Sequence, residues 1–158
     1  MMKRFAIFLI CLLIAGCSFS QEPAPTSVDI PTPVPMNITI YHGNENADGF
    51  ESEIYEVFYF NSTTLIEKLI EAEVLTQGVE LLSEEYDGSC LHLDFNNAFR
   101  DLLCSMGTAG EYIIIGSLVN TFLENYQDTV TSIFITVNGE IIESGHVIYD
   151  FELIHYES

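Results

Sequence analysis

EYIIIGSLVNTFLENY, residues 111–126, is the segment from which the fold can be read, because its apolar side chains recur at the spacing of an α-helix. A helix with one continuous apolar face packs that face against another element. We therefore expect a long amphipathic helix lying on a flat partner. The apolar stripe consists of Ile115, Leu118, Val119, Phe122, Leu123 and Tyr126.

A β-hairpin is predicted directly after this helix. Residues 133–137 alternate between two faces, and the dipeptide Asn138-Gly139 favours a two-residue turn, because a type I′ turn needs positive φ at both central positions. Residues 140–142 form the returning strand, and residues 147–154 supply one more short strand. Phe134 points away from the core-facing side, and an apolar residue there can mark a contact surface.

The preceding sequence predicts two further hairpins and two shorter helices. The strands are expected at residues 38–41 and 54–60 around the turn 43–49, and at 79–86 and 90–95 around a type I′ turn at Asp87-Gly88. The helices are expected at 64–73, starting with a capping box of Thr64 and Glu67, and at 96–106, ended by residues 107–110. This order predicts an α+β fold, a mostly antiparallel sheet with helices packed on one face.

The N-terminus carries an export signal. Lys3 and Arg4 precede a short apolar run, which ends in Ile14-Ala15-Gly16-Cys17. This pattern resembles the lipobox of bacterial lipoproteins, in which the cysteine receives diacylglycerol and the chain is cleaved before it. We expect residues 1–16 to be a signal peptide and Cys17 to carry the lipid that anchors the protein on the extracytoplasmic face of a cell membrane. The sequence leaves open which membrane.

A proline-rich tether follows the anchor. All five prolines lie between residues 18 and 36, and such a chain is extended at about 3.1 Å per residue. We expect residues 17–35 to form the lipidated tether and residues 36–158 to form a single domain.

The charge of the chain excludes several partners. The formal net charge is −20, with 24 acidic residues against four basic ones. Nucleic acid is excluded, because phosphate binding needs clustered lysine and arginine. Anionic lipid headgroups would also repel this surface, so the acyl chains must hold the protein at the membrane.

The domain contains two cysteines, Cys90 and Cys104. In an exported protein they could form a disulfide, or they could be separate thiols packed as small apolar groups. The sequence leaves both alternatives open. Neither cysteine belongs to a CxxC or Cys/His pattern, so no zinc site is expected.

Three segments in order carry a family resemblance. They are Leu91-His92-Leu93-Asp94-Phe95, the helix with Ser117-Leu118-Val119-Asn120-Thr121-Phe122, and the hairpin from Ile133 to Glu140. Together they resemble the GerMN domain, a family named after a sporulation and germination lipoprotein. The resemblance covers roughly residues 37–150.

The resemblance implies a non-enzymatic envelope module without a cofactor. The family is similar to ring-building domains of transenvelope complexes, which associate side by side through sheet and helix faces. Its named member carries two such domains in tandem, whereas this chain has one. The implied partner is another envelope protein or a second copy of the chain.

The Asn120-Thr121 pair lies in the middle of the long helix, where asparagine is unfavourable unless its side chain is compensated. A hydrogen bond from the side chain to nearby backbone would compensate it. We therefore interpret Asn120 as a structural residue that locks the helix to a loop or strand, rather than as a ligand-binding residue.

No catalytic motif is present in the sequence, so we expect no enzyme activity. His92 and Asp94 share one strand face, but two groups without a third ligand do not make a metal site. Residues 44–49 match the first half of a calcium loop, but the match fails at Tyr55, where a bidentate glutamate is required.

Two functions are therefore compatible with the sequence. The first is a structural or adaptor lipoprotein of the envelope, related through its family to sporulation or germination. The alternative is a lipoprotein that binds a cation or small ligand through acidic loops.

We predict that Cys17→Ser abolishes membrane retention, because one lost thiol removes the attachment point of both acyl chains. Membrane fractionation after extraction of peripheral proteins measures this. A Cys17→Ser protein that remains in the extracted membranes would contradict the lipid anchor, and Cys104→Ser provides the matched control that should stay in the membrane fraction.

Overall fold

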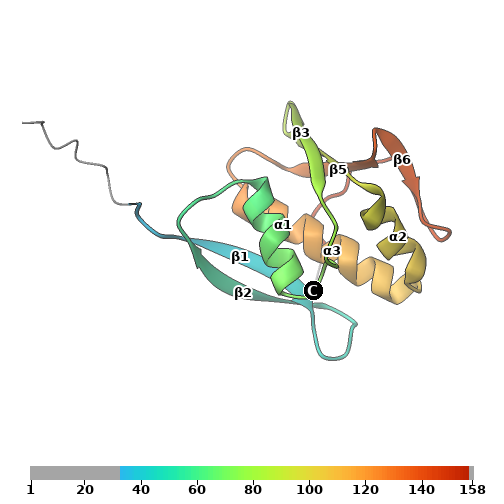
Figure 1. Ribbon diagram of the computed structural model, residues 1–158, viewed down its shortest axis with the longest axis horizontal. Helices are drawn as coiled ribbons and strands as arrows, with labels where there is room; N and C mark the ends of the chain where they lie inside the picture. The colour runs from blue at the N-terminus through green and yellow to red at the C-terminus, as the bar shows by residue number, and fades with distance from the viewer. Residues whose placement is uncertain (1–32, 157–158) are drawn as a thin grey trace, which may run out of the picture. The chain divides into compact units, whose positions relative to one another are not determined.

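The computed structural model describes residues 33–156, and the chain there forms three helices and seven strands (Figure 1). The predicted signal peptide, the lipidated Cys17 and the tether up to residue 32 lie outside the described residues. The elements are β1 (Met36–Gly43), β2 (Phe50–Val57), α1 (Ser62–Glu71), β3 (Leu81–Asp87), β4 (Cys90–Phe95), α2 (Asn97–Ser105), α3 (Thr108–Asn125), β5 (Ser132–Val137), β6 (Glu140–Glu143) and β7 (Ile148–Tyr149).

The strands form two sheets. Strands β1 and β2 make an antiparallel pair, and the other five form a sheet in the order β3-β4-β5-β6-β7. Only β4 and β5 in that sheet are parallel. They can be parallel because α2 and α3 connect them, and a parallel pair needs such a crossover. The predicted α+β fold with a mostly antiparallel sheet is confirmed.

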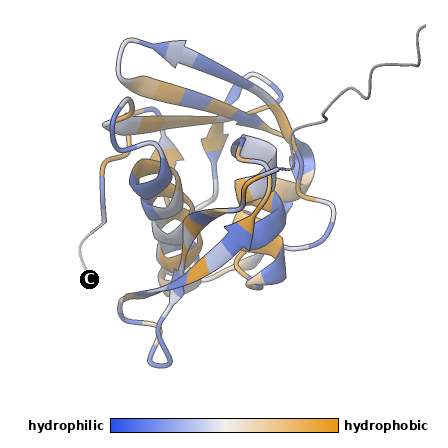
Figure 2. Cartoon of the chain, turned by 90° about the vertical axis from the view of Figure 1, so that its left-hand side faces the viewer, coloured by the Kyte–Doolittle hydropathy of each residue, from blue (hydrophilic) through white to orange (hydrophobic). Residues whose placement is uncertain are grey.

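The core lies between the five-stranded sheet and the helices. The alternation predicted for β4 and β5 is confirmed, and Figure 2 shows hydrophobic and hydrophilic residues alternating along the strands. The other face of β4 and β5, with His92, Asp94, Phe134 and Thr136, is half-buried. The fully buried face consists of Leu91, Leu93, Phe95, Ile133, Ile135 and Val137.

Helix α3 is buried on more than the predicted stripe. It contacts β5 of the large sheet and, more extensively, β1 of the small one. Besides the apolar stripe, Ser117, Asn120 and Thr121 are also buried. A helix that is covered on several sides in this way is a core helix rather than one lying on a single flat surface.

Two predicted helix boundaries were wrong. Asn61, not Thr64, caps α1: its side-chain oxygen accepts a hydrogen bond from the Thr64 backbone N–H at 2.8 Å. Residues 107–110 do not separate the last two helices, because Gly107 is the N-cap of α3 and Gly110 lies in its first turn. The extended backbone of Met106 and Gly107 is sufficient to change the chain direction.

The three predicted hairpins are present, but one turn differs. Asn138 and Gly139 both have positive φ, of 50° and 75°, as a type I′ turn requires. In the β3–β4 hairpin Asp87 pairs with Cys90, so Gly88 and Ser89 form the turn, and only Gly88 has positive φ. The type I′ turn predicted at Asp87-Gly88 was therefore wrong.

The ends of two predicted strands also differ. Strand β2 ends at Val57 rather than at residue 60. The strand predicted at 147–154 is reduced to β7 and one isolated bridge between Ile133 and Leu153.

Both cysteines of the described domain are free thiols. Cys90 is buried and Cys104 is exposed, so the structure supports the unpaired alternative. No helix within residues 33–156 is both long enough and apolar enough to cross a membrane.

We predict that Leu118→Ala or Phe122→Ala lowers the free energy of unfolding by about 2–5 kcal/mol, because both side chains are fully buried and truncation leaves a cavity. Urea denaturation followed by circular dichroism measures the change. The control Ile54→Ala, at a side chain 73% exposed, should stay within about 0.5 kcal/mol of the native value. Equal midpoints for all the variants would contradict this packing.

Candidate functional site

Asn120 of α3 binds the C-terminal segment. Its side-chain oxygen accepts a hydrogen bond from the Tyr156 N–H at 2.8 Å, and its amide nitrogen donates to the Tyr156 carbonyl at 3.0 Å. The asparagine is fully buried. One amide thus satisfies both backbone groups of Tyr156, much as a neighbouring strand would.

Thr121 and Asn125 bind β1 in a similar way. The Tyr41 N–H donates to Thr121 Oγ1 at 2.9 Å. The Thr39 N–H donates to Asn125 Oδ1 at 3.0 Å, and Asn125 Nδ2 donates to the Thr39 carbonyl at 2.6 Å. These are the groups of β1 that face away from β2. We call Asn120, Thr121 and Asn125 the polar clamp of α3, since they attach two distant segments to one helix.

Asp94 attaches the Asn138-Gly139 turn to the end of β4. Its Oδ1 accepts hydrogen bonds from Thr136 Oγ1 and from the Gly139 N–H, both at 2.7 Å. Asn138 Nδ2 donates to Asn97 Oδ1 at 2.9 Å. The two turn residues singled out from the sequence are therefore held by contacts within the fold.

Phe134 lies beside His92 on the face of the sheet that the helices leave uncovered. The rings are 5.1 Å apart between centroids and tilted by 37°. His92 and Asp94 line a small depression of about 220 Å³ on this face. Among the described residues no group of three metal-ligating side chains occurs there or elsewhere.

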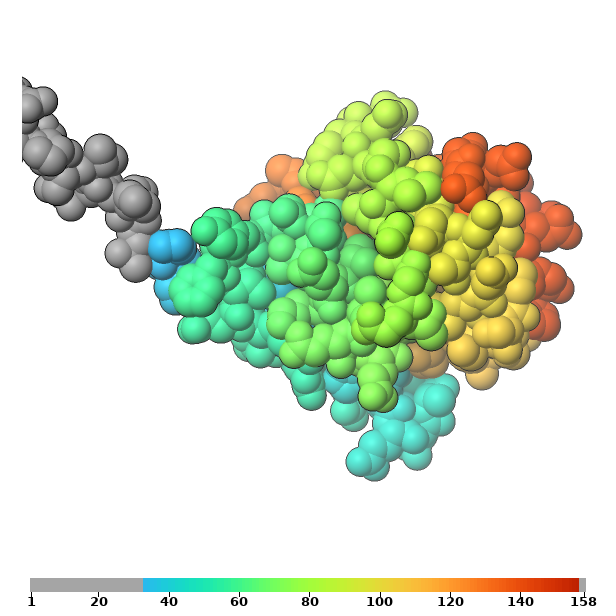
Figure 3. All heavy atoms as spheres, viewed as in Figure 1, coloured from blue at the N-terminus to red at the C-terminus, as the bar shows by residue number. Residues whose placement is uncertain are grey.

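The loop that partly matches a calcium site is closed by its own side chains. Asn44 Nδ2 donates to Asp48 Oδ1 at 2.9 Å, and the Asp48 N–H donates to Asn44 Oδ1 at 3.2 Å. The loop projects from the body of the domain (Figure 3). The side-chain oxygens of Asn44 and Asp48 accept hydrogen bonds within the turn. These hydrogen bonds account for the polar residues of the loop without a bound ion.

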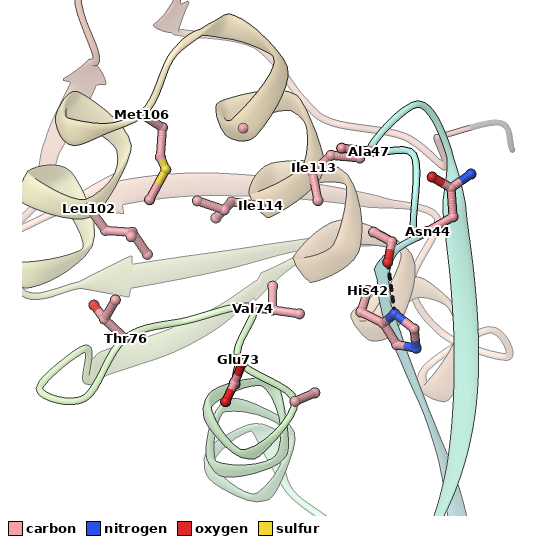
Figure 4. Close-up of a pocket in the computed structure, with 13 residues that line it drawn as sticks. His42, Asn44, Ala47, Glu73, Val74, Thr76, Leu102, Met106, Ile113 and Ile114 are labelled. Carbon is pink, nitrogen blue, oxygen red and sulfur yellow. Dashed lines mark hydrogen bonds between the residues drawn. The ribbon is translucent and has the colours of Figure 1, made fainter.

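A hollow of about 400 Å³ lies in the described domain (Figure 4). His42 lies at its rim, where Nδ1 is 2.9 Å from the Gly43 carbonyl oxygen. Most of the lining side chains are apolar or small, and His42, Asn44, Glu73 and Thr76 are the polar ones. The lining consists of His42, Gly43, Asn44, Ala47, Ala72, Glu73, Val74, Thr76, Leu102, Met106, Gly110, Ile113 and Ile114.

No sequence pattern predicts this hollow, because its lining comes from three segments far apart in the chain. The sequence contains one local indication of the hollow, the glycine at position 43. Gly43 allows β1 to approach α3, since a Cβ at this position would lie 2.7 Å from Ile113 Cγ2. A glycine at the end of a predicted strand can mark such a close approach.

Comparison with known proteins identifies relatives of the fold. A family model described as sporulation and spore germination, Germane, matches residues 39–143. The tandem GerMN domains of the sporulation protein GerM from Bacillus subtilis superpose with a TM-score of 0.58 at 18% identity, covering 83% of this chain and 48% of theirs. The chain thus spans about half the length of that protein.

A second solved structure is more distant. A candidate lipoprotein from Clostridium perfringens has a TM-score of 0.47 at 15% identity, and the alignment covers 76% of this chain and 87% of the other. No curated protein sequence matches the chain.

We predict that Asn120→Ala destabilises the protein by about 1–3 kcal/mol, because it leaves the backbone groups of Tyr156 without their partner. Urea denaturation measures the loss. Asn46→Ala, in the exposed β1–β2 turn, is the matched control and should change stability by less than about 0.5 kcal/mol. If both variants unfold at the same urea concentration, the clamp contributes nothing to stability.

Proposed function

Since the chain belongs to the Germane family of sporulation and spore germination proteins, we propose that it is a non-enzymatic adaptor of the cell envelope, held at the membrane by lipid on Cys17. The family match runs from β1 to the end of β6. It therefore includes the β1–β2 sheet, four of the five strands of the large sheet and all three helices.

One observation carries the adaptor role: the outer face of β4 and β5 bears Phe134 and is not covered by a helix. The opposite face of the same strands packs fully against the core. An apolar ring on an open sheet face is a candidate contact point for another protein. Phe134 and His92 occupy paired positions on adjacent strands and form a single aromatic surface.

The anchor and tether support an envelope location. Two acyl chains on Cys17 would hold the protein firmly, and the proline-rich segment would keep the domain away from the bilayer. The acidic surface makes direct contact with anionic headgroups unfavourable. In this arrangement the domain is free to reach a protein partner on the extracytoplasmic face of the membrane.

Ion binding through acidic loops has less support. The loop at residues 44–49 uses its side chains internally, and residues 33–156 contain no three-residue metal cluster. The tandem GerM protein is about twice as long as this chain, so its role as a whole protein is not transferred to this chain. The proposal for this chain is therefore limited to a single-domain adaptor.

We predict that Phe134→Glu leaves the fold intact and reduces recovery of cross-linked envelope neighbours, because a charge on the outer face disrupts an apolar contact. The matched control is Phe58→Glu, the same change at an exposed side chain after β2. Circular dichroism checks folding, and mass spectrometry compares the neighbours. A folded Phe134→Glu protein with an unchanged set of neighbours would remove this face from the interface.

A further inference from the structure

A further cavity, of about 200 Å³, lies between the first turn of α3 and the C-terminal segment. It is smaller than the ~300–1,000 Å³ typical of sites for drug-sized ligands, so it suits a short side chain or a small molecule. Its distinguishing feature is a carboxylate surrounded by aromatic rings. The lining includes Glu111, Tyr112, Tyr149, Phe151 and Tyr156.

Glu111 is buried, with only 2% of its surface exposed. Its Oε1 accepts a hydrogen bond from the Tyr149 hydroxyl at 2.6 Å. Its Oε2 is also buried, and no group among the described residues donates to it. A buried carboxylate with one oxygen unpaired is costly unless a cation or donor reaches it.

Tyr149 fixes which carboxylate oxygen remains available. Burial, together with the hydrogen bond to Glu111 and the charge of that residue, raises the pKa of Tyr149 well above its ordinary value. The phenol therefore remains protonated and keeps donating to Oε1. Glu111 lies in the first turn of α3, at the positive end of the helix dipole, which attracts negative charge.

Aromatic rings form the walls of the cavity. Tyr112 and Tyr156 are 5.3 Å apart between ring centroids, and Tyr149 and Phe151 are 6.2 Å apart. Aromatic faces attract cations through their quadrupole, and they do so more strongly where water is excluded. A carboxylate and several rings around one small cavity are therefore a cation-recognition arrangement.

Gly116 and Phe50 hold part of this wall in place. The Phe50 ring packs where a side chain on residue 116 would lie, since a Cβ there would be 2.2 Å from Phe50 Cζ. Phe50 in turn contacts the Tyr112 ring, at 5.4 Å between centroids, and the Tyr156 ring, at 6.2 Å. Phe50 thus supports the rings of Tyr112 and Tyr156 in the wall of the cavity.

We propose that this cavity binds a primary alkylammonium group, as found in a lysine side chain or a small free amine. An ammonium group is a compact charge with three donors, so it can bond to the single free oxygen of Glu111 while its alkyl stem lies against the rings. A guanidinium group prefers to bind both oxygens of a carboxylate, and Tyr149 already occupies one of them.

The ammonium must come from outside the described domain. The described domain has two long cationic side chains. Lys68 contacts Glu71 and Arg100 contacts Glu140, and neither lines the cavity. The net charge of −20 attracts cations from solution. The site is independent of the proposed lipid anchor and of the contact at Phe134, so it can be tested separately.

Titration of the full chain in a non-ionic detergent, with n-butylammonium as the probe, tests the site. Isothermal calorimetry should show saturable binding of n-butylammonium and none of 1-pentanol, an uncharged molecule of similar size. Glu111→Gln should weaken binding by about tenfold or more, as expected when a charge-assisted hydrogen bond is lost. Glu67→Gln removes one exposed charge from α1 and should bind the amine like the native protein.

A second variant guards against misfolding of Glu111→Gln. Phe151 is 48% exposed, so Phe151→Ala should fold normally, and circular dichroism checks this. Because Phe151 lines the cavity, the variant should bind the amine more weakly than the native protein does. Native-like affinity in both folded variants would overturn the proposal. Equal binding of 1-pentanol, or tighter binding of n-propylguanidinium, would also overturn it.

The source of the ammonium group is decided by one further probe. Binding of Nα-acetyl-lysine methylamide would support a lysine side chain of a partner protein as the occupant. Binding of n-butylammonium without binding of the lysine derivative would support a small free amine. Failure of both amines to bind would overturn the site while leaving the adaptor proposal untouched.

Discussion

The rest of the structure depends on the burial of α3 between two sheets. Polar side chains on an enclosed helix are stabilised when they find partners inside the fold, although Ser117 Oγ and Glu111 Oε2 have none among the described residues. Asn120, Thr121 and Asn125 find such partners in the backbone of the C-terminal segment and of β1. The same hydrogen bonds that compensate the polar residues therefore attach the two ends of the domain to its central helix.

This attachment determines what the surfaces of the domain can do. The helices cover one face of the large sheet, which leaves Phe134 and His92 on the other face. The C-terminal segment, held at Tyr156, closes the aromatic cavity over Glu111. An open sheet face and a cation-binding cavity are both suited to a protein that works by contact, as proposed for this member of a sporulation and germination family.

Local pattern predicted the elements well, because alternation, helical spacing and the Asn138-Gly139 turn each depend on neighbouring residues. Two local features were misplaced by a few residues, the helix cap at Thr64 and the turn at Asp87-Gly88. The larger failures occurred where distant contacts decide the outcome. The apolar stripe of α3 did not indicate that β1 covers its polar side, and a glutamate in a first helical turn normally faces solvent, so Glu111 gave no sign of burial. The parallel pairing of β4 and β5 is likewise a property of the crossover and not of either strand.

Amide hydrogen exchange of the full chain tests the central claim most directly. The N–H groups of Tyr41 and Tyr156 bond to side chains of α3 rather than to a neighbouring strand. If the polar clamp holds both segments, these two amides exchange as slowly as the buried amides of α3, since all of them open only with the core. Exchange as fast as that of the exposed turn at residues 45–48 would contradict the account.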